Sequence, residues 1–354
     1  MPNLPLRDPG MRRVVLVRLR VGLGDLLCSA PALRALRRHR PDVEVTLVTW
    51  PEMATVVERL GHVHDLLPFP GFAGIPERPA EPELWESFVL AAQDRHFDLA
   101  LQCYGDNPAA NTVAAALGAP LVGGFSPRGH MPAPGSEHLH LPYPTAEHEV
   151  RRHLLLLERL GLPISPADEQ LSFAVSSEEE AAHARSLDEL GLRRHGYVVL
   201  HPGASSPSRR WPLASFAEVA RRLHADGLRV VVTGSAGERD LVSGLAGRAG
   251  VPVTDVCGRT DLPGLALLLR DSAVLVGNDT GTAHLAAAVG ARSVTIFQPG
   301  DPRRWGYRGP TARALTPDVA CAPCPHLECP IDFRCSRATT PERVLSAVRA
   351  VAAA

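Results

Sequence analysis

The fold is decided by residues 14–25, which read VVLVRLRVGLGD. The apolar part, Val14–Leu19, is too short to cross a membrane and contains an arginine, so it predicts a buried strand. Gly22 and Gly24 allow a tight turn after it, and a helix is predicted from about Asp25 to Arg40. A strand that gives way to a helix through a glycine turn is the unit from which parallel α/β sheets are built.

The same strand-to-helix rhythm repeats along the chain. Further strands are predicted at Val43–Val48, Leu99–Cys103, Val198–His201, Val230–Thr233, Val274–Gly277 and Ser293–Phe297. Loops rich in Gly and Pro occupy residues 71–82 and 123–144, and a junction is expected near residues 160–190. We therefore predict two doubly wound α/β halves around a cleft, with ligands bound at the carboxyl ends of the strands.

The composition argues against several classes of function. The 354 residues carry a formal net charge of -1, which disfavours bulk electrostatic binding of nucleic acid. The chain has no lysine, and its 37 Lys and Arg positions are therefore all arginine, which excludes a lysine Schiff base and a P-loop lysine. We expect no secretory signal or membrane span and a cytosolic, cytoplasmic site of action, with peripheral membrane contact left open.

Two loops in the second half carry residues suited to phosphate. After His201, the hydroxyls of Ser205 and Ser206 can bond phosphate oxygens and Arg209 can clamp a diphosphate, although solvated side chains in an ordinary loop would look the same. After Gly277, the run NDTGTAH begins a helix whose amides can cradle a phosphate. In this run Asp279 is suited either to binding sugar hydroxyls or to holding the loop, and His284 is either a ligand or a packed structural residue.

Two carboxylates at helix starts have an ordinary structural explanation as well as a functional one. Glu238, in the turn after Thr233 and Gly234, could receive ribose hydroxyls or simply complement the helix dipole. Asp25 could cap its helix or act as a catalytic group that points into the cleft. Because most of these motifs fall in the second half, that half is predicted to hold a nucleotide diphosphate.

Together the motifs resemble those of glycosyltransferase family 9, which contains the ADP-heptose:lipopolysaccharide heptosyltransferases. The resemblance rests on LVRLRVGLGD (16–25) continuing to PALRAL (31–36), on HPGA (201–204) with RRWP (209–212), and on NDTGTAH (278–284). It implies a GT-B fold of two Rossmann-like domains that face each other across a central cleft. The implied parts are an acceptor domain (11–165), a nucleotide-sugar donor domain (190–335) and a C-terminal helix (336–354) that packs back on the acceptor domain.

The resemblance also implies an inverting transfer of a heptose or related sugar from a nucleotide diphosphate donor, typically ADP-heptose, without a required cofactor. Asp25 would be the general base for the acceptor hydroxyl. Arg209, at a position where the family usually has lysine, would stabilise the departing diphosphate. The positions that match donor-binding residues are Gly24, Ser205, Ser206, Arg209, Gly234, Glu238, Asp279, Thr280, Gly281, Thr282 and His284.

The expected acceptor loops differ from what lipopolysaccharide would require. Inner-core acceptors carry acidic sugars and phosphates, yet residues 71–82, 103–111 and 123–140 offer few cations, among them Arg78 and Arg128. The composition, rich in Ala and free of Lys, is typical of a GC-rich bacterium. The acceptor hypothesis is therefore a secondary metabolite or a cell-surface glycan, that is, a carbohydrate or a glycosylated small molecule.

Four cysteines form a cluster near the C-terminus. Cys321, Cys324, Cys329 and Cys335 have the spacing C-x2-C-x4-C-x5-C, which could wrap a structural Zn²⁺ but is tight for a two-knuckle site. Reduced thiols or a local disulfide are the favoured interpretation, and no metal is expected to take part in catalysis.

Two other functions stay open. A GT-B nucleotide-sugar epimerase or hydrolase would use the same donor site, and turnover without an acceptor would identify it. A noncatalytic binding or scaffold protein would need neither Asp25 nor the donor loops. The presence of both favours the transferase.

Overall fold

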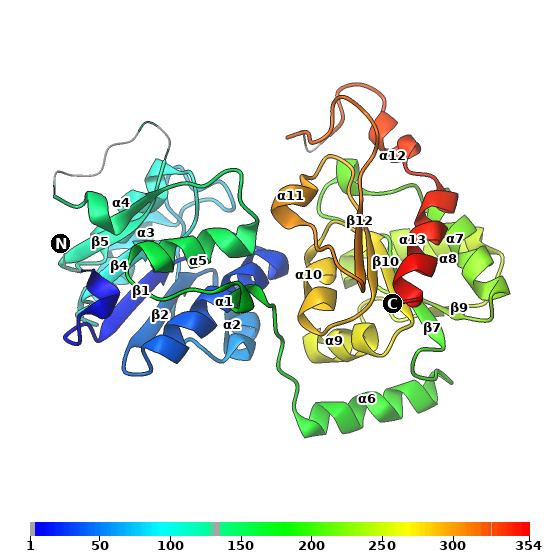
Figure 1. Ribbon diagram of the computed structural model, residues 1–354, viewed down its shortest axis with the longest axis horizontal. Helices are drawn as coiled ribbons and strands as arrows, with labels where there is room; N and C mark the ends of the chain where they lie inside the picture. The colour runs from blue at the N-terminus through cyan, green and yellow to red at the C-terminus, as the bar shows by residue number, and fades with distance from the viewer. Residues whose placement is uncertain (1–3, 128, 130–134, 327) are drawn as a thin grey trace. The chain divides into compact units, whose positions relative to one another are not determined.

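The structure, a computed structural model, describes residues 4–127, 129, 135–326 and 328–354. The chain divides after Leu171 into two units, and each is built around its own parallel sheet (Figure 1). None of the helices in the described ranges combines the length and the apolar character needed to cross a membrane.

The N-terminal unit contains a sheet with the order β3-β2-β1-β4-β5-β6. The strands are β1 (Arg13–Val17), β2 (Glu44–Thr49), β3 (Asp65–Pro68), β4 (Leu99–Gln102), β5 (Leu121–Ser126) and β6 (His140–Pro142). The helices are α1 (Leu23–His39), α2 (Ala54–Leu60), α3 (Pro82–Gln93), α4 (Pro108–Ala116) and α5 (Glu149–Arg159). Val14 pairs with Val45 on one side and with Leu99 on the other, so β1 is a central strand.

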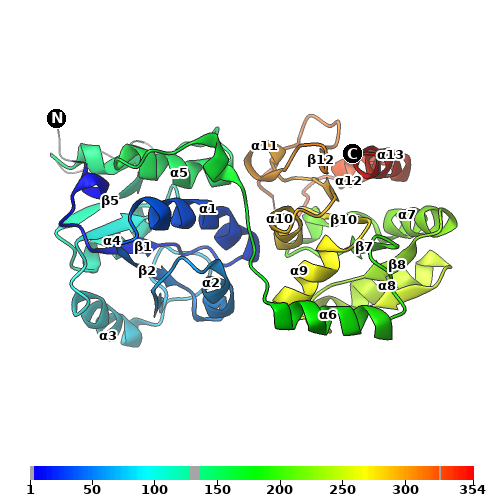
Figure 2. The same cartoon turned by 60° about the horizontal axis from the view of Figure 1, so that its bottom comes forward.

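Helices cover both faces of this sheet, with α1 and α5 on one face and α3 on the other (Figure 2). Val15 and Val17 belong to the core cluster that contains Phe88 of α3. Side chains alternate along a strand, so Leu16 and the residue after the strand, Arg18, point toward α1 and α5. The observed strand ends at Val17, before the predicted end at Leu19. Arg18 lies just beyond the strand, on the side that α1 and α5 cover.

The C-terminal unit contains a sheet with the order β12-β11-β10-β7-β8-β9. The strands are β7 (Tyr197–His201), β8 (Arg229–Val232), β9 (Val253–Asp255), β10 (Val274–Asn278), β11 (Ser293–Ile296) and β12 (Ala312–Leu315). The helices are α6 (Ser177–Glu189), α7 (Leu213–Ala225), α8 (Arg239–Ala249), α9 (Leu262–Arg270), α10 (Gly281–Ala288), α11 (Pro302–Trp305), α12 (Arg334–Ala338) and α13 (Pro341–Ala352).

Both sheets have the same order when each is numbered from its own first strand, so the prediction of two Rossmann-like domains is confirmed. In each sheet the order reverses once, between β1 and β4 in the first and between β7 and β10 in the second. Loops that leave neighbouring strands in opposite directions open a crevice at this point, which is where ligands bind in such sheets. These two points locate the candidate site residues.

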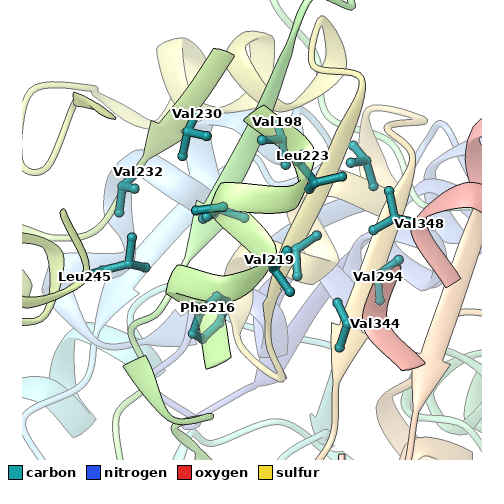
Figure 3. Close-up of a cluster of buried hydrophobic side chains, with 14 of the residues drawn as sticks. Val198, Phe216, Val219, Leu223, Val230, Val232, Leu245, Val294, Val344 and Val348 are labelled. Atoms are coloured by element: carbon teal, nitrogen blue, oxygen red, sulfur yellow. The ribbon is translucent and has the colours of Figure 1, made fainter. Parts of the chain in front are cut away.

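The C-terminal unit extends beyond the predicted limits of the donor domain at both ends. The core in Figure 3 joins strand residues to α7, α8 and α13, and it includes Val198, Phe216, Val219, Leu223, Val230, Val232, Leu245, Val294, Val344 and Val348. The apolar face of α13 is thus buried inside this unit, which includes the predicted C-terminal segment 336–354. The helix α6, which lies before the predicted start at residue 190, packs on α9.

Leu345→Ala tests whether α13 is part of the C-terminal fold. Leu345 is buried in the core, and its truncation is expected to lower the free energy of unfolding by about 2–4 kcal/mol in urea titrations. The control is Leu90→Ala on α3, where the side chain is 55% exposed and the cost should stay within about 0.5 kcal/mol. Equal effects of the two changes would contradict the packing of α13 described above.

Candidate active site

Arg18 joins three parts of the N-terminal unit beneath the point where the strand order reverses. Its side chain is 1% exposed. Its Nη1 donates to the carbonyls of Cys103 (3.2 Å) and Tyr104 (3.3 Å), which follow β4. Its Nη2 donates to the Asp25 carbonyl at 3.1 Å and to Asp25 Oδ1 at 3.4 Å. The guanidinium therefore fixes the start of α1 against the end of β4.

Glu149, the first residue of α5, supplies the buried countercharge. Its Oε1 accepts from Arg18 Nη2 at 3.2 Å, and its Oε2 accepts from Arg152 Nη1 at 3.2 Å. Arg152 also donates to the hydroxyl of Tyr143 at 2.6 Å. Burial acts to lower the pKa of Arg18, but the carboxylates of Glu149 and Asp25 outweigh it and raise the pKa, so the guanidinium stays charged. Two cations and two carboxylates thus balance each other in the interior.

Asp25 lies in the first turn of α1, and Gly22 is the N-cap residue. The Asp25 side chain is 24% exposed, so one part of it is held by Arg18 while another part reaches the surface. A Cβ on Gly22 would lie only 2.7 Å from Asp25 Oδ2, so a larger residue at this position would displace the carboxylate. The helix-cap explanation is therefore incomplete, because the side chain is part of a wider charge network.

His153 packs beside this network and is neutral at pH 7. Its Nε2 lies 3.8 Å from Glu149 Oε1, and its ring is 5.7 Å from that of Phe125. Burial and the positive charge of Arg18 lower the pKa of His153 to about 4, against the opposing effect of Glu149. A protonated His153 would be a third cation beside Arg18 and Arg152 in the same interior.

Asn278 plays the corresponding structural part in the C-terminal unit. It ends β10 and is 1% exposed. Its Nδ2 donates to the carbonyls of Pro202 (2.9 Å) and Gly203 (3.2 Å), which follow β7, and its Oδ1 accepts from the Trp211 backbone N–H at 3.0 Å. One amide therefore holds the whole loop between β7 and α7 at the reversal of strand order.

This loop presents Arg209 and restrains Arg210. Arg210 donates from Nε and Nη2 to the Ala204 carbonyl at 3.0 and 2.9 Å. Arg209 ends the short helix η5 (Pro207–Arg209), and its half-buried guanidinium has no hydrogen bond or ion pair within the part of the chain that the structure describes. Ser205 is exposed, whereas the buried Ser206 shares a hydrogen bond with Ser208 at 3.1 Å. Arg209 is the free cation of the pair.

The start of α10 carries the third motif. Thr280 is the N-cap residue of α10, yet its buried Oγ1 has no partner among the described residues, and Gly281 and Thr282 follow it in the first turn. Asp279 is 5% exposed. His284 accepts or donates through Nδ1 to the Tyr307 hydroxyl at 2.9 Å and packs against Trp305, which joins α10 to α11 (Figures 1 and 2).

Glu238 caps a helix in this structure. It closes η6 (Ala236–Glu238), and its Oε2 accepts from Ser235 N–H at 2.8 Å and from Ser235 Oγ at 2.9 Å. A Cβ on Gly203 would lie 1.9 Å from Glu238 Oε1, and one on Gly234 would lie 3.3 Å from Glu238 Cβ. The structural explanation of Glu238 is thus observed, while its role toward a ribose stays a prediction.

The structure brings the donor residues together within one unit and adds partners that the sequence did not reveal. Gly203 lies against the Glu238 carboxylate, and its carbonyl accepts a hydrogen bond from Asn278. The loops after β7, β8 and β10 therefore meet at one edge of the sheet. Asp25 and Gly24 belong to the other unit. Glu149 and Arg152 lie outside the sequence motifs. The signal that could have indicated a buried countercharge was Arg18 within the apolar run Val14–Leu19.

The cysteine cluster has no metal geometry in the described residues. The four cysteines of the cluster are free thiols: Cys321, Cys324, Cys329 and Cys335. Among the described residues, which leave out Leu327 of this segment, no three or more His, Cys, Asp or Glu side chains are placed to hold a metal ion. Hydrogen bonds from the backbone of Ile331 and Phe333 lower the pKa of Cys329. Zinc binding by the cluster thus has no geometric support in the described part of the chain.

Comparisons with known proteins agree with this architecture. Residues 93–333 match the model of glycosyltransferase family 9 (heptosyltransferase). Lipopolysaccharide heptosyltransferase 3 of Escherichia coli K12 is 24% identical over 80% of this chain and 81% of its own length. A family 9 glycosyltransferase structure from Veillonella parvula gives a TM-score of 0.81 at 19% identity over 97% of each chain. The structure of E. coli ADP-heptose heptosyltransferase II gives 0.73 at 21% identity, over 97% of this chain and 99% of that one, and the expected GT-B fold is confirmed.

His153→Gln tests the charge network through pH. The pKa of His153 is about 4 in the folded chain, below its ordinary value of 6.5, so the unfolded state binds the proton first. The stability that the neutral ring contributes is complete above pH 6.5 and is lost as the pH falls toward 4, by about 3 kcal/mol at most. Urea unfolding at several pH values should show this dependence in the wild type and lose that share in His153→Gln. Parallel curves for the two proteins would contradict the assignment.

Proposed function

Because the chain belongs to glycosyltransferase family 9, the heptosyltransferases, we propose that it transfers a heptose or a related sugar from ADP-heptose to an acceptor hydroxyl. The observation that carries the proposal is the juxtaposition, in each unit, of the predicted site residues with the point where the strand order reverses. The ADP-heptose donor is supported by its place in the name of the E. coli heptosyltransferase II whose fold this chain shares.

In this proposal Asp25 is the general base. The partly exposed carboxylate takes the proton of the acceptor hydroxyl while that oxygen attacks the anomeric carbon of the sugar. The bond from the anomeric carbon to the diphosphate oxygen breaks, ADP leaves, and attack from the opposite face inverts the configuration. Arg18 fixes the orientation of the base through its hydrogen bonds to the Asp25 carbonyl and Oδ1. A catalytic group must be correctly oriented as well as close to the reacting atoms.

The C-terminal unit is proposed to hold the donor. The guanidinium of Arg209 has no partner among the described residues, which suits a group that must neutralise the leaving diphosphate. The start of α10, with the unpartnered Thr280 Oγ1 and the positive end of the helix dipole, suits the phosphate oxygens. Glu238 keeps Oε1 beside Gly203, outside its cap hydrogen bonds, and this oxygen is the one proposed to meet the ribose.

The acceptor is proposed to be a secondary metabolite or a cell-surface glycan with few negative charges. Of the cations in the expected acceptor loops, Arg78 is already paired with Glu52 and lies 5.6 Å over the ring of Trp50. Arg128 lies outside the described residues. An acceptor rich in phosphate would require more free cations than the described loops supply.

Asp25→Asn is expected to leave donor affinity within about threefold of wild type and to lower transfer by about a hundredfold or more, because amide nitrogen and oxygen are poor bases. Calorimetry with ADP-heptose and ADP release with a panel of glycoside acceptors measure the two properties. Asp94→Asn, at the exposed end of α3, is the control and should change neither property. Full activity of Asp25→Asn, or loss of donor binding, would remove Asp25 from the proposed role.

Arg209→Ala and Arg210→Ala form a second, matched pair. Arg209→Ala is expected to lower kcat by about a hundredfold without a change in thermal midpoint, because the side chain has no hydrogen bond or ion pair to lose among the described residues. Arg210→Ala is expected to lower the midpoint, since two hydrogen bonds to Ala204 disappear. An unchanged turnover rate in Arg209→Ala would place Arg209 outside the site.

A further inference from the structure

Gln298 is a buried amide without a partner. It lies two residues beyond the end of β11 and is 1% exposed, and neither its Nε2 nor its Oε1 makes a hydrogen bond to any described residue. Burial of an amide without hydrogen bonds is costly, and the position therefore indicates a group that joins it from outside the chain.

A second glutamine shows how this chain satisfies such a side chain when the role is structural. Gln102, at the end of β4, is 0% exposed. Its Nε2 donates to the carbonyls of Gly105 (2.8 Å) and Phe125 (3.1 Å), and its Oε1 accepts from the backbone N–H groups of Tyr104 (2.7 Å) and Gly105 (3.0 Å). The two glutamines are equally buried, but the amide of Gln102 has hydrogen-bond partners at both ends, whereas that of Gln298 has none among the described residues.

Gln298 lies beside the donor residues. Asn278 of β10 pairs with Ile296 of β11, so Gln298 lies two residues beyond the position paired with Asn278, at the carboxyl edge of the sheet. The segment that begins with Gln298 covers Asp279, because a Cβ on Gly300 would lie 2.4 Å from Asp279 Oδ2. Thr280 Oγ1, on the adjoining loop, also lacks a partner among the described residues.

The chemistry of an amide selects its ligand. Oε1 needs a donor and Nε2 needs an acceptor, and both needs must be met at one place. A phosphate offers acceptor oxygens alone and would leave Oε1 facing negative charge. A pair of neighbouring hydroxyl groups offers both a donor and an acceptor, and sugars carry such pairs.

The order of the strands places that sugar. Glu238 follows β8, Arg209 follows β7, Thr280 follows β10 and Gln298 follows β11, and these strands are neighbours in that order. A nucleotide sugar laid along the edge, with its nucleoside at β8 and its phosphates at β7 and β10, brings its sugar to β11. Three strand spacings of about 4.8 Å span about 14 Å, a length that ribose, diphosphate and sugar together can cover.

We propose that Gln298 binds hydroxyl groups of the donor sugar and thereby selects which sugar the protein transfers. The proposal rests on the donor site of the proposed function. It assigns Gln298 to recognition of the sugar and gives it no part in binding the nucleotide.

Gln298→Met keeps the size of the side chain and removes both polar ends. Calorimetry is expected to give an ADP affinity within about twofold of wild type and an ADP-heptose affinity that is about tenfold or more weaker, at about three- to tenfold per lost hydrogen bond. Without ligand, the thermal midpoint of Gln298→Met should equal or exceed that of wild type, because an unsatisfied amide is removed. Gln102→Met should lower the midpoint, since its hydrogen bonds are satisfied.

The outcomes separate this proposal from the one beneath it. If wild type binds ADP but Gln298→Met binds ADP-heptose as tightly as wild type does, the donor site stands and the role of Gln298 is wrong. A lower midpoint in Gln298→Met would show that water or protein holds the amide, which also overturns the role. If wild type binds neither ADP nor ADP-heptose, the proposed function fails and this inference fails with it.

Discussion

In each unit one buried polar side chain ties together the two strand ends between which the order of the sheet reverses. Arg18 donates to the carbonyls that follow β4, and Asn278 donates to those that follow β7. Loops diverge at this point and leave backbone carbonyls that no neighbouring strand can satisfy. A buried polar side chain donates hydrogen bonds to these carbonyls and also fixes the loops, so the predicted site residues lie on restrained loops in each unit.

The two units differ in how far the charged and polar side chains near the reversal of strand order are paired within the protein. In the N-terminal unit the carboxylates of Glu149 and Asp25 balance the guanidinium groups of Arg18 and Arg152, and Asp25 lies at the partly exposed edge of that network. In the C-terminal unit the guanidinium of Arg209 and the amide of Gln298 have no partners among the described residues. In the proposed function the first arrangement orients a base, and the second binds a ligand that carries charge and hydroxyl groups. This difference matches the proposed division into an acceptor half and a donor half.

Much of the fold could be predicted from the sequence, because strand, turn and helix signals are local. The glycine turn before Asp25 and the loops at Arg209 and Thr280 lie where the pattern placed them. The partners of Arg18 could not be predicted, since Glu149 is 131 residues away and carries no motif. The helix α6 was missed because it buries little apolar surface, with His183 and Leu187 as its buried residues. For Glu238 the predicted structural alternative was a carboxylate favoured by the helix dipole, and the structure adds capping hydrogen bonds from Ser235.

In the proposed function the C-terminal unit binds an adenine nucleotide, and calorimetric titration of the wild-type protein with ADP, GDP, UDP and dTDP tests this most directly. Micromolar binding of ADP is expected, with an affinity about tenfold or more above that for the other three. Equal binding of all four would contradict the claim of an adenine site, and a preference for GDP would assign a different donor. Absence of binding by every nucleotide would contradict the donor site itself.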